Sequence, residues 1–265
     1  MKNKISYIKK LIKTLIWPIM FMIGSFIIRY IFVAIYNLKE KNGMSDNQFL
    51  KYIKTIEYQE KLNNYINSKV ILISLIILII FLPIFYKKYK KYIIKNKLKI
   101  QNTYIPIIFG ISISLIYNIL AFNINNIVNF TNNYVGNNMP IISQIISSVL
   151  VGPILEEVLF RGIIYNKLKE FNSPMKSIIL TSIIFGIFHF NLLNMIFAFG
   201  MSFIFIYLYE KNKSLKYPII MHVFLNLTSI VFVEYISKFN IYLSGLIFIV
   251  NITILLLLKK YVINK

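Results

Sequence analysis

The stretch GPILEEVLFRG, residues 152–162, places two adjacent carboxylates inside an apolar segment long enough to cross a membrane. A charge at the centre of such a segment costs about 3 kcal/mol or more, and charges retained there are usually functional. Because a helix turns by about 100° per residue, Glu156 and Glu157 face different directions. Glu157 lies four residues before Arg161, and this spacing predicts an ion pair on one helix face. Glu156 is left without a partner on its own helix.

An unpaired carboxyl group at low dielectric is poised for proton transfer near neutral pH. Pro153 lies one turn before Glu156, where it removes a backbone hydrogen bond. We expect a kink there that opens space for water. For Glu157 and Arg161, a purely structural pair that fixes the helix register is an equally direct interpretation.

The surrounding chain is apolar in blocks rather than at amphipathic spacing, and 57% of its 265 residues are hydrophobic. This pattern is typical of a polytopic membrane protein. We therefore predict an all-α fold, a bundle of about eight transmembrane helices that forms a single domain over residues 1–265. The expected spans are 11–36, 70–86, 104–123, 141–165, 176–190, 193–209, 217–236 and 241–258. The fifth and sixth share an apolar stretch that is broken only at HFNLLN (189–194), so their boundary is the least defined.

Charge distribution predicts the orientation. The net charge is +21, and the lysines gather at the N-terminus, at 87–99, at 166–176, at 210–216 and at the C-terminal end. These segments fall on one side of an eight-span bundle, so the positive-inside rule places both termini in the cytoplasm. The segment 37–69 mixes signs and is expected to form the longest loop on the opposite side. We expect the lysines to contact membrane lipids rather than nucleic acid.

The absence of cysteine excludes a thiol nucleophile and thiolate metal ligands. Both histidines of the chain, His189 and His222, fall within apolar segments. His189 lies four residues after Phe185, and His222 lies four residues before Asn226, so each pair shares a helix face. Gly186 is expected to let another helix approach closely. Counted along straight helices, Glu156, His222 and His189 lie roughly 15, 8 and 20 Å from the cytoplasmic ends, so tilt or a kink must bring them level.

Three motifs in order, EEVLFR, FGIFH and HVFLN, resemble those of the CPBP intramembrane proteases. That family comprises the type II CAAX prenyl endopeptidases and the bacterial bacteriocin-processing and self-immunity proteins, also called Abi proteins. The similarity covers about residues 140–235, which we take as the catalytic core. The resemblance implies a multi-pass cell-membrane endopeptidase that acts on a peptide or lipidated-peptide substrate.

By this resemblance, Glu156 is the base that activates water, and His189 assists it. His222 and Asn226 stabilise the oxyanion, Glu157 with Arg161 orders the site, and Phe185 is a packing neighbour. Amide hydrolysis requires an activated water and donors aimed at the oxyanion, and the helical spacing singles out Glu156 independently of the family. The identity of the substrate and the oligomeric state do not follow from the sequence.

Three alternatives remain at this point. A zinc-dependent version would use His189, His222 and Glu156 as ligands, but no His-Glu-x-x-His helix is present, so we favour a reaction without a cofactor. A bacteriocin-immunity protein could use the same bundle without catalysis. A proton-coupled transporter would also bury Glu and His, yet the inverted repeats typical of that class are not evident. A serine hydrolase is disfavoured because no Gly-x-Ser-x-Gly stretch occurs.

Overall fold

The computed structural model describes residues 2–93, 103–128, 139–236 and 241–263. Within these ranges every regular element is a helix, which confirms the all-α prediction. The elements are α1 (Lys2–Glu40), α2 (Asp46–Tyr52), α3 (Ile56–Ile93), α4 (Tyr104–Val128), α5 (Ile141–Gln144), η2 (Ile145–Val151), α6 (Gly152–Glu157), η3 (Val158–Tyr165), α7 (Asn166–Lys169), α8 (Pro174–Ile187), α9 (Leu192–Asn212), α10 (Lys216–Ile236) and α11 (Ile241–Ile263).

Seven of the eight predicted spans lie in one helix or in a continuous run of helices, whereas the fifth, 176–190, extends three residues past the end of α8 at Ile187. In the described chain, five stretches are long and apolar enough to cross a membrane: Ile5–Glu40, Ile56–Lys87, Tyr104–Ile124, Ile141–Lys169 and Leu192–Asn212. Three further apolar helices are shorter: Pro174–Ile187, Lys216–Phe232 and Tyr242–Leu258. A helical membrane bundle is therefore present, and α8 is too short to cross about 30 Å of hydrocarbon without tilting or thinning of the bilayer.

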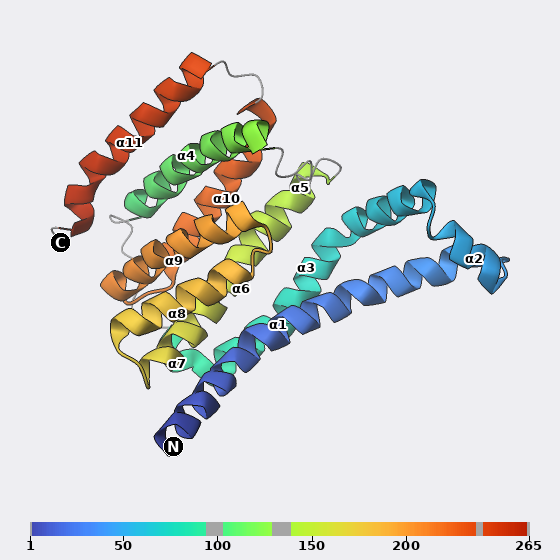
Figure 1. Ribbon diagram of the computed structural model, residues 1–265, viewed down its shortest axis with the longest axis horizontal. Coiled ribbons are helices and arrows are strands. Elements are labelled where there is room, and N and C mark those ends of the chain that lie inside the picture. Colours follow the sequence, from blue (N-terminus) through green and yellow to red (C-terminus); the bar gives the residue numbers. More distant parts are fainter. Residues whose placement is uncertain (1, 94–102, 129–138, 237–240, 264–265) are drawn as a thin grey trace.

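The helices form a main body and a hairpin beside it (Figure 1). In the body, α10 packs against α4 and α9, α8 packs against α9, and α11 packs on the outer side of α4. The hairpin consists of α1 and α3, which contact η3 near the N-terminal half of α1 and the C-terminal half of α3 and diverge from the body towards α2. Residues from both parts meet at η3, whose eight residues are all buried. The core of the molecule thus lies around the helix that follows the two glutamates.

Close helix packing depends on two glycines. A Cβ on Gly110 would lie 2.5 Å from the carbonyl oxygen of Met221, so α4 and α10 touch through backbone atoms. A Cβ on Gly186 would lie 2.9 Å from the carbonyl oxygen of Met195 in α9. The expected close approach at Gly186 is therefore confirmed, and α8 and α9 form a tight antiparallel pair.

The prediction of a long loop at 37–69 is wrong. The chain turns only at 41–45 and 53–55, and the remainder belongs to α1, α2 and α3. Ser45 caps α2: its hydroxyl accepts from the Gln48 N–H, and the Gln48 side chain accepts from the Ser45 N–H. A hydrogen bond from Lys41 holds the pKa of the Asp46 carboxyl below its usual value. These polar interactions stabilise helices beyond the apolar stretch. The mixed charges of the segment gave no indication of these helices.

Several predicted connections lie outside the described residues. They include residues 94–99 of the basic segment 87–99, most of the uncharged segment between the third and fourth spans, and the turn near Lys238. The boundary between the fifth and sixth spans is described. Helix α8 ends at Ile187 and α9 begins at Leu192, so the chain breaks where HFNLLN indicated.

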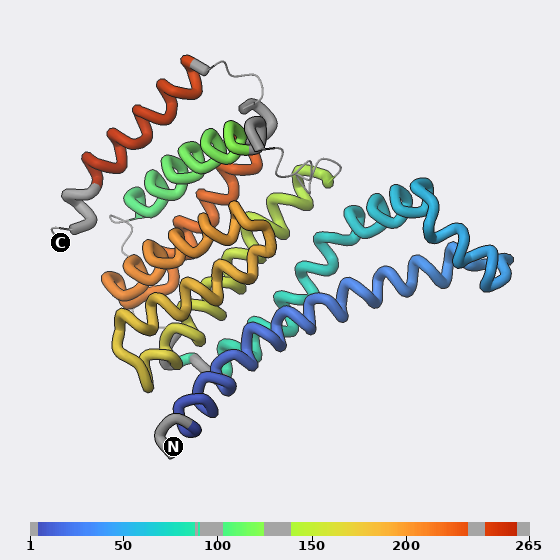
Figure 2. The backbone as a smooth tube through the Cα atoms, in the orientation of Figure 1, coloured from blue at the N-terminus to red at the C-terminus, as the bar shows by residue number. Residues whose placement is uncertain are grey.

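The stretch 141–169 follows one continuous path through the body, as the tube in Figure 2 shows, but its hydrogen-bond register changes along the way. The α-helical turns around the glutamates are flanked by π-helical segments, η2 before them and η3 after them. Such wide turns are often found at functional sites. Pro153 occupies the first turn of α6, directly after η2. The distortion expected at Pro153 is thus a widening of the helix.

Candidate active site

The glutamate that lies deepest in the site is Glu157, whose side chain is fully buried. Its Oε1 accepts a hydrogen bond from Arg161 Nη1 at 2.9 Å, which is the ion pair that the spacing predicts. The same oxygen lies 3.0 Å from His222 Nδ1. Since a carboxylate only accepts hydrogen bonds, Nδ1 of His222 carries the proton in this contact. Glu157 therefore joins its own helix to α10.

Arg161 is enclosed by two aromatic rings. Its guanidinium carbon lies 4.2 Å from the centroid of the Phe185 ring and 4.8 Å from that of the Phe205 ring. Both contacts are within the range of cation–π attraction, which is stronger at desolvated sites. The Phe205 ring also stacks on the imidazole of His222, with centroids 4.9 Å apart. The packing role expected for Phe185 fits these contacts, and Phe205 has the same role on the opposite side.

Glu156 faces a different direction, as the helix geometry predicts. Its side chain retains 30% exposure, and its Oε2 lies 3.9 Å from His222 Nε2. None of the described residues donates a hydrogen bond to this buried oxygen. A buried carboxylate oxygen normally has a partner, so this atom is a natural acceptor for a water molecule or a substrate group.

His189 lies in the turn after α8, and not inside a helix as expected, because α8 ends two residues earlier. The N–H of Asn191 donates to the His189 carbonyl oxygen at 2.6 Å, which forms a tight turn centred on Phe190 with a φ of 54°. Positive φ is rare for a bulky residue and is typically found at functional sites. The short helix and this turn bring His189 into the cavity beside Glu156.

The imidazole of His189 still contacts Phe185, four residues earlier. Its Nδ1 lies 2.9 Å from the Phe185 carbonyl oxygen, which can only accept. The proton is therefore on Nδ1, and Nε2 of the neutral ring is left as a hydrogen-bond acceptor. His189 is thus suited to orient a water molecule rather than to donate to it.

Asn226 is held by a carbonyl that the helix itself leaves unpaired. The N–H of Gly152 donates to Ser147, five residues earlier, instead of to Ser148. With the same five-residue step, the N–H that would donate to the Ser148 carbonyl is that of residue 153. Residue 153 is a proline, which has no N–H. The side-chain amide of Asn226 supplies the missing donor, with Nδ2 2.8 Å from the Ser148 oxygen. One of the two amide hydrogens is used in this way, and the other stays for a ligand.

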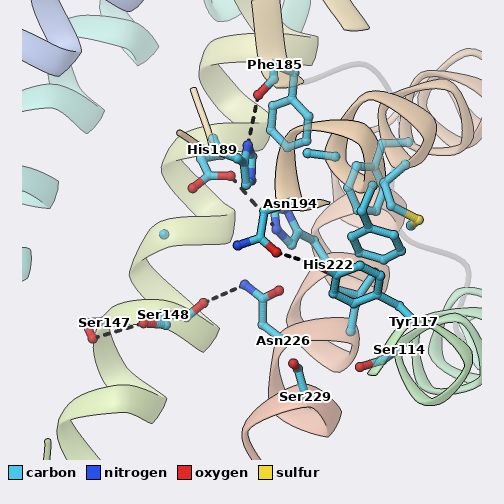
Figure 3. A pocket seen from close by; sticks show the side chains of 17 residues that line it. Ser114, Tyr117, Ser147, Ser148, Phe185, His189, Asn194, His222, Asn226 and Ser229 are labelled. Carbon is cyan, nitrogen blue, oxygen red and sulfur yellow. Dashed lines mark hydrogen bonds and ion pairs between the residues drawn. The ribbon is translucent and has the colours of Figure 1, made fainter. Parts of the chain in front are cut away.

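These side chains border a cavity of about 590 Å³, which we call the polar cavity (Figure 3). Glu156, His189, His222 and Asn226 all line it, so the structure brings the four predicted catalytic residues together. Glu157 and Arg161 lie behind this layer, fully buried. A volume of this size is typical of small-molecule and peptide-side-chain sites.

Sequence reasoning missed several lining residues. Tyr117 of α4 donates a hydrogen bond to Asn194 of α9, and its ring stacks on Phe197 at 3.8 Å. Ser114 and Ser229 line the same cavity. Serine, asparagine and tyrosine are frequent throughout this chain, and no fixed spacing connects α4 to the motif helices, so the sequence carries no signal for them.

The described side chains were compared with the ligand geometry that zinc requires. Over the described ranges, no three His, Cys, Asp or Glu side chains converge as zinc ligands do. We therefore derive no step through a metal ion.

The fold and this site define a class of protein. The chain is a helical membrane protein with a buried glutamate and histidine site, and its residues 138–228 match the family model described as type II CAAX prenyl endopeptidase Rce1-like. This segment contains all three motifs, and the match confirms the resemblance to the CPBP proteases over it.

A particular relative is found in Bacillus subtilis (strain 168). Over 83 residues the chain is 40% identical to the protein named "Putative membrane peptidase YdiL". The alignment covers 31% of this chain and 34% of the relative, so the similarity spans about a third of either protein. No solved structure matches the chain.

Proposed function

We propose that this protein is an intramembrane endopeptidase in which Glu156 activates a water molecule. One observation carries the proposal: Glu156 Oε2 is buried, has no hydrogen-bond donor among the described residues, and lies 3.9 Å from His222 Nε2 at a cavity. Both comparisons name peptidases, which favours hydrolysis over the immunity and transport alternatives. The substrate is an apolar peptide or a lipidated peptide that reaches the site from the membrane.

The geometry supports the following steps. A water molecule donates one hydrogen bond to Glu156 and another to Nε2 of His189. Glu156 removes a proton as the water oxygen attacks the carbonyl carbon of the scissile amide. The C=O π bond becomes an oxyanion, which accepts from the free amide hydrogen of Asn226 and from Nε2–H of His222 when that ring is protonated on both nitrogens. Glu156 then returns the proton to the amide nitrogen as the C–N bond breaks.

Glu157 and Arg161 support this chemistry without touching the substrate. Glu157 holds Nδ1 of His222, so that Nε2 is directed to Glu156. The Glu157 carboxylate and the Arg161 guanidinium carry opposite charges, which limits the cost of burying the pair. Glu157 and Arg161 are thus positioning residues.

The test compares wild type with Glu156→Gln in membranes, using fluorogenic apolar peptides with and without a prenylated cysteine. Glu156→Gln keeps the shape of the side chain but loses the base, so we expect cleavage to fall by 10³-fold or more, within the range of general-base effects and water activation combined. Glu60→Gln, on the exposed surface of α3, is the matched control and should cleave normally.

Thermal unfolding and gel filtration establish that each variant is folded. Identical product patterns from wild type and Glu156→Gln would remove the protease proposal. If the purified protein contained stoichiometric zinc and lost cleavage activity after chelation, the zinc-dependent mechanism would be supported instead. The immunity role would be favoured by two results together: wild type cleaves no peptide, and cells that carry Glu156→Gln are protected against a bacteriocin as well as cells that carry wild type.

A further inference from the structure

A second cavity lies between the α1–α3 hairpin and the helices of the active site. It has a volume of about 350 Å³, and we call it the hairpin cavity. Its walls are formed by Phe21, Met22, Ser25, Phe26, Arg29, Ile73, Ile77, Glu156, Phe160, Phe188, His189 and Phe190. Glu156 and His189 line the polar cavity as well, so the two cavities meet at these side chains.

Apart from Glu156, His189 and Arg29, the walls of the hairpin cavity offer almost no free hydrogen-bonding groups. The Ser25 hydroxyl donates to the Phe21 carbonyl oxygen at 2.8 Å, and Nδ1 of His189 is bound to Phe185. Every residue of a peptide carries a backbone donor and an acceptor, which are costly to leave unpaired in an apolar site. A hydrocarbon chain has no such groups. The lining therefore fits an alkyl chain better than a peptide backbone.

Arg29 brings a positive charge to this lining. It belongs to the apolar stretch Ile5–Glu40 of α1, its side chain is exposed, and no acidic side chain in the described chain forms an ion pair with it. Charges within membrane helices are usually paired or take part in binding. A guanidinium in this position is suited to bind a phosphate or carboxylate group.

The positions along α1 give the cavity a direction. Phe21 and Arg29 are eight residues apart, which corresponds to about 12 Å along the helix. The arginine is thus at one end of the cavity and the Phe21 ring at the other. Tyr30, directly after Arg29, is 71% exposed, and tyrosine is enriched where a membrane meets water. An amphiphile would place its anionic group at Arg29 and its chain towards Phe21.

We propose that the hairpin cavity binds one anionic membrane lipid, whose alkyl chain lies along α1 and α3 and whose phosphate or carboxylate accepts hydrogen bonds from Arg29. The bound chain lies against Glu156 and His189, next to the polar cavity. Binding of the lipid does not depend on the proposed peptidase activity.

The test measures lipid retention by native mass spectrometry of the full chain. The probes are phosphatidylglycerol, diacylglycerol with the same acyl chains, and oleate. We expect one phosphatidylglycerol or oleate per chain, and a roughly tenfold weaker retention of diacylglycerol, which has no anionic group, in line with the strength of charge-assisted hydrogen bonds. The ratio of phosphatidylglycerol to oleate identifies the headgroup as phosphate or carboxylate.

Four variants locate the site. Arg29→Gln should weaken retention of the anionic lipid about tenfold, and Arg29→Lys should restore most of it. Lys39→Gln removes a charge from the same helix outside the cavity and should have no effect. Ser25→Trp fills the cavity without changing the charge and should abolish lipid retention. This variant tests the site even if Arg29→Gln does not fold. The proposal would be overturned if Lys39→Gln and Arg29→Gln lost the lipid equally, or if Ser25→Trp retained it fully. It would also be overturned if a lipidated peptide were bound in the cavity instead of the lipid.

Discussion

Glu157 and Arg161 show how two buried charges depend on each other. Both side chains are fully buried, and the pair is enclosed by Phe185 and Phe205. Removal of one partner leaves the other charged and desolvated, which is costly even where the intact pair adds little. Two Arg161 donors, Nε and Nη2, have no hydrogen-bond acceptor among the described residues, and the guanidinium lies against two aromatic rings instead. The aromatic rings are therefore part of what makes the pair tolerable.

We expect Arg161→Met to lower the free energy of unfolding by roughly 3–5 kcal/mol. Lys61→Met breaks an ion pair of the same i,i+4 spacing at the surface, between Lys61 and Glu57, and should cost less than about 1 kcal/mol. Thermal or denaturant unfolding in detergent measures both. Equal losses in the two variants would show that Arg161 does not stabilise Glu157 in the way described.

Local spacing explains which contacts of the site were predictable. The pair Glu157–Arg161 follows from four residues of separation on one helix. The contact between Glu157 and His222 joins residues 65 positions apart, and that between Asn226 and Ser148 joins residues 78 apart. Such contacts depend on helix packing and on the π register of η2, neither of which leaves a periodic pattern in the sequence. Phe205 was missed because it is one phenylalanine among many.

At the scale of elements, the position of α10 relative to α4 determines where His222 and Asn226 lie. The Cβ built on Gly110 would be 2.5 Å from the Met221 carbonyl oxygen, and this atom is backbone that cannot rotate away. Met221 directly precedes His222. Any separation of these helices therefore displaces the histidine from Glu157.

We predict that Gly110→Ala destabilises the protein by about 1–3 kcal/mol, as expected for overpacking, and lowers peptide cleavage as well. Gly200→Ala in α9 is the matched control, because no atom lies within 4 Å of its added Cβ. It should be neutral or stabilise by up to about 1 kcal/mol, because alanine favours helix. Unfolding and cleavage assays on both variants check this, and a neutral Gly110→Ala would contradict the close contact.

The hairpin was the element least accessible to sequence analysis. Apolar stretches mark the part of α1 and α3 that resembles a span, but both helices continue past it. Their extensions are supported by the Lys61–Glu57 pair and by ring contacts among Tyr36, Tyr58 and Tyr65. Mixed charges and tyrosines are compatible with either a loop or a polar helix, so the pattern alone favoured the wrong structure.

At the scale of the whole molecule, one end of the α1–α3 hairpin is fixed to the body and the other is not. Tyr7 donates a hydrogen bond to Asn172, and Lys10 lies over the Phe171 ring, so the start of α1 is at the level of the turn before α8. With 39 residues, α1 is about 58 Å long, nearly twice the hydrocarbon thickness. Its far end at α2 should therefore reach the opposite side of the membrane.

Single cysteines test this orientation, since the natural chain has none. We expect a membrane-impermeant maleimide to label Asn42→Cys on intact cells, because Asn42 lies in the exposed turn before α2. Met175→Cys, at the start of α8 and 63% exposed, should be labelled only after permeabilisation. The reverse pattern would place the termini outside the cell and contradict the orientation expected from the lysines.

The Ser148 carbonyl, which has no donor within its own helix, has a consequence for how the protein is made. Its partner, Asn226, is synthesised 78 residues later, roughly ten seconds at ordinary translation rates. Glu157 likewise waits for His222. Until α10 is inserted, Glu157 has its Arg161 partner but lacks His222, and the Ser148 carbonyl lacks Asn226. Assembly of the site is therefore completed only when α10 packs into the bundle.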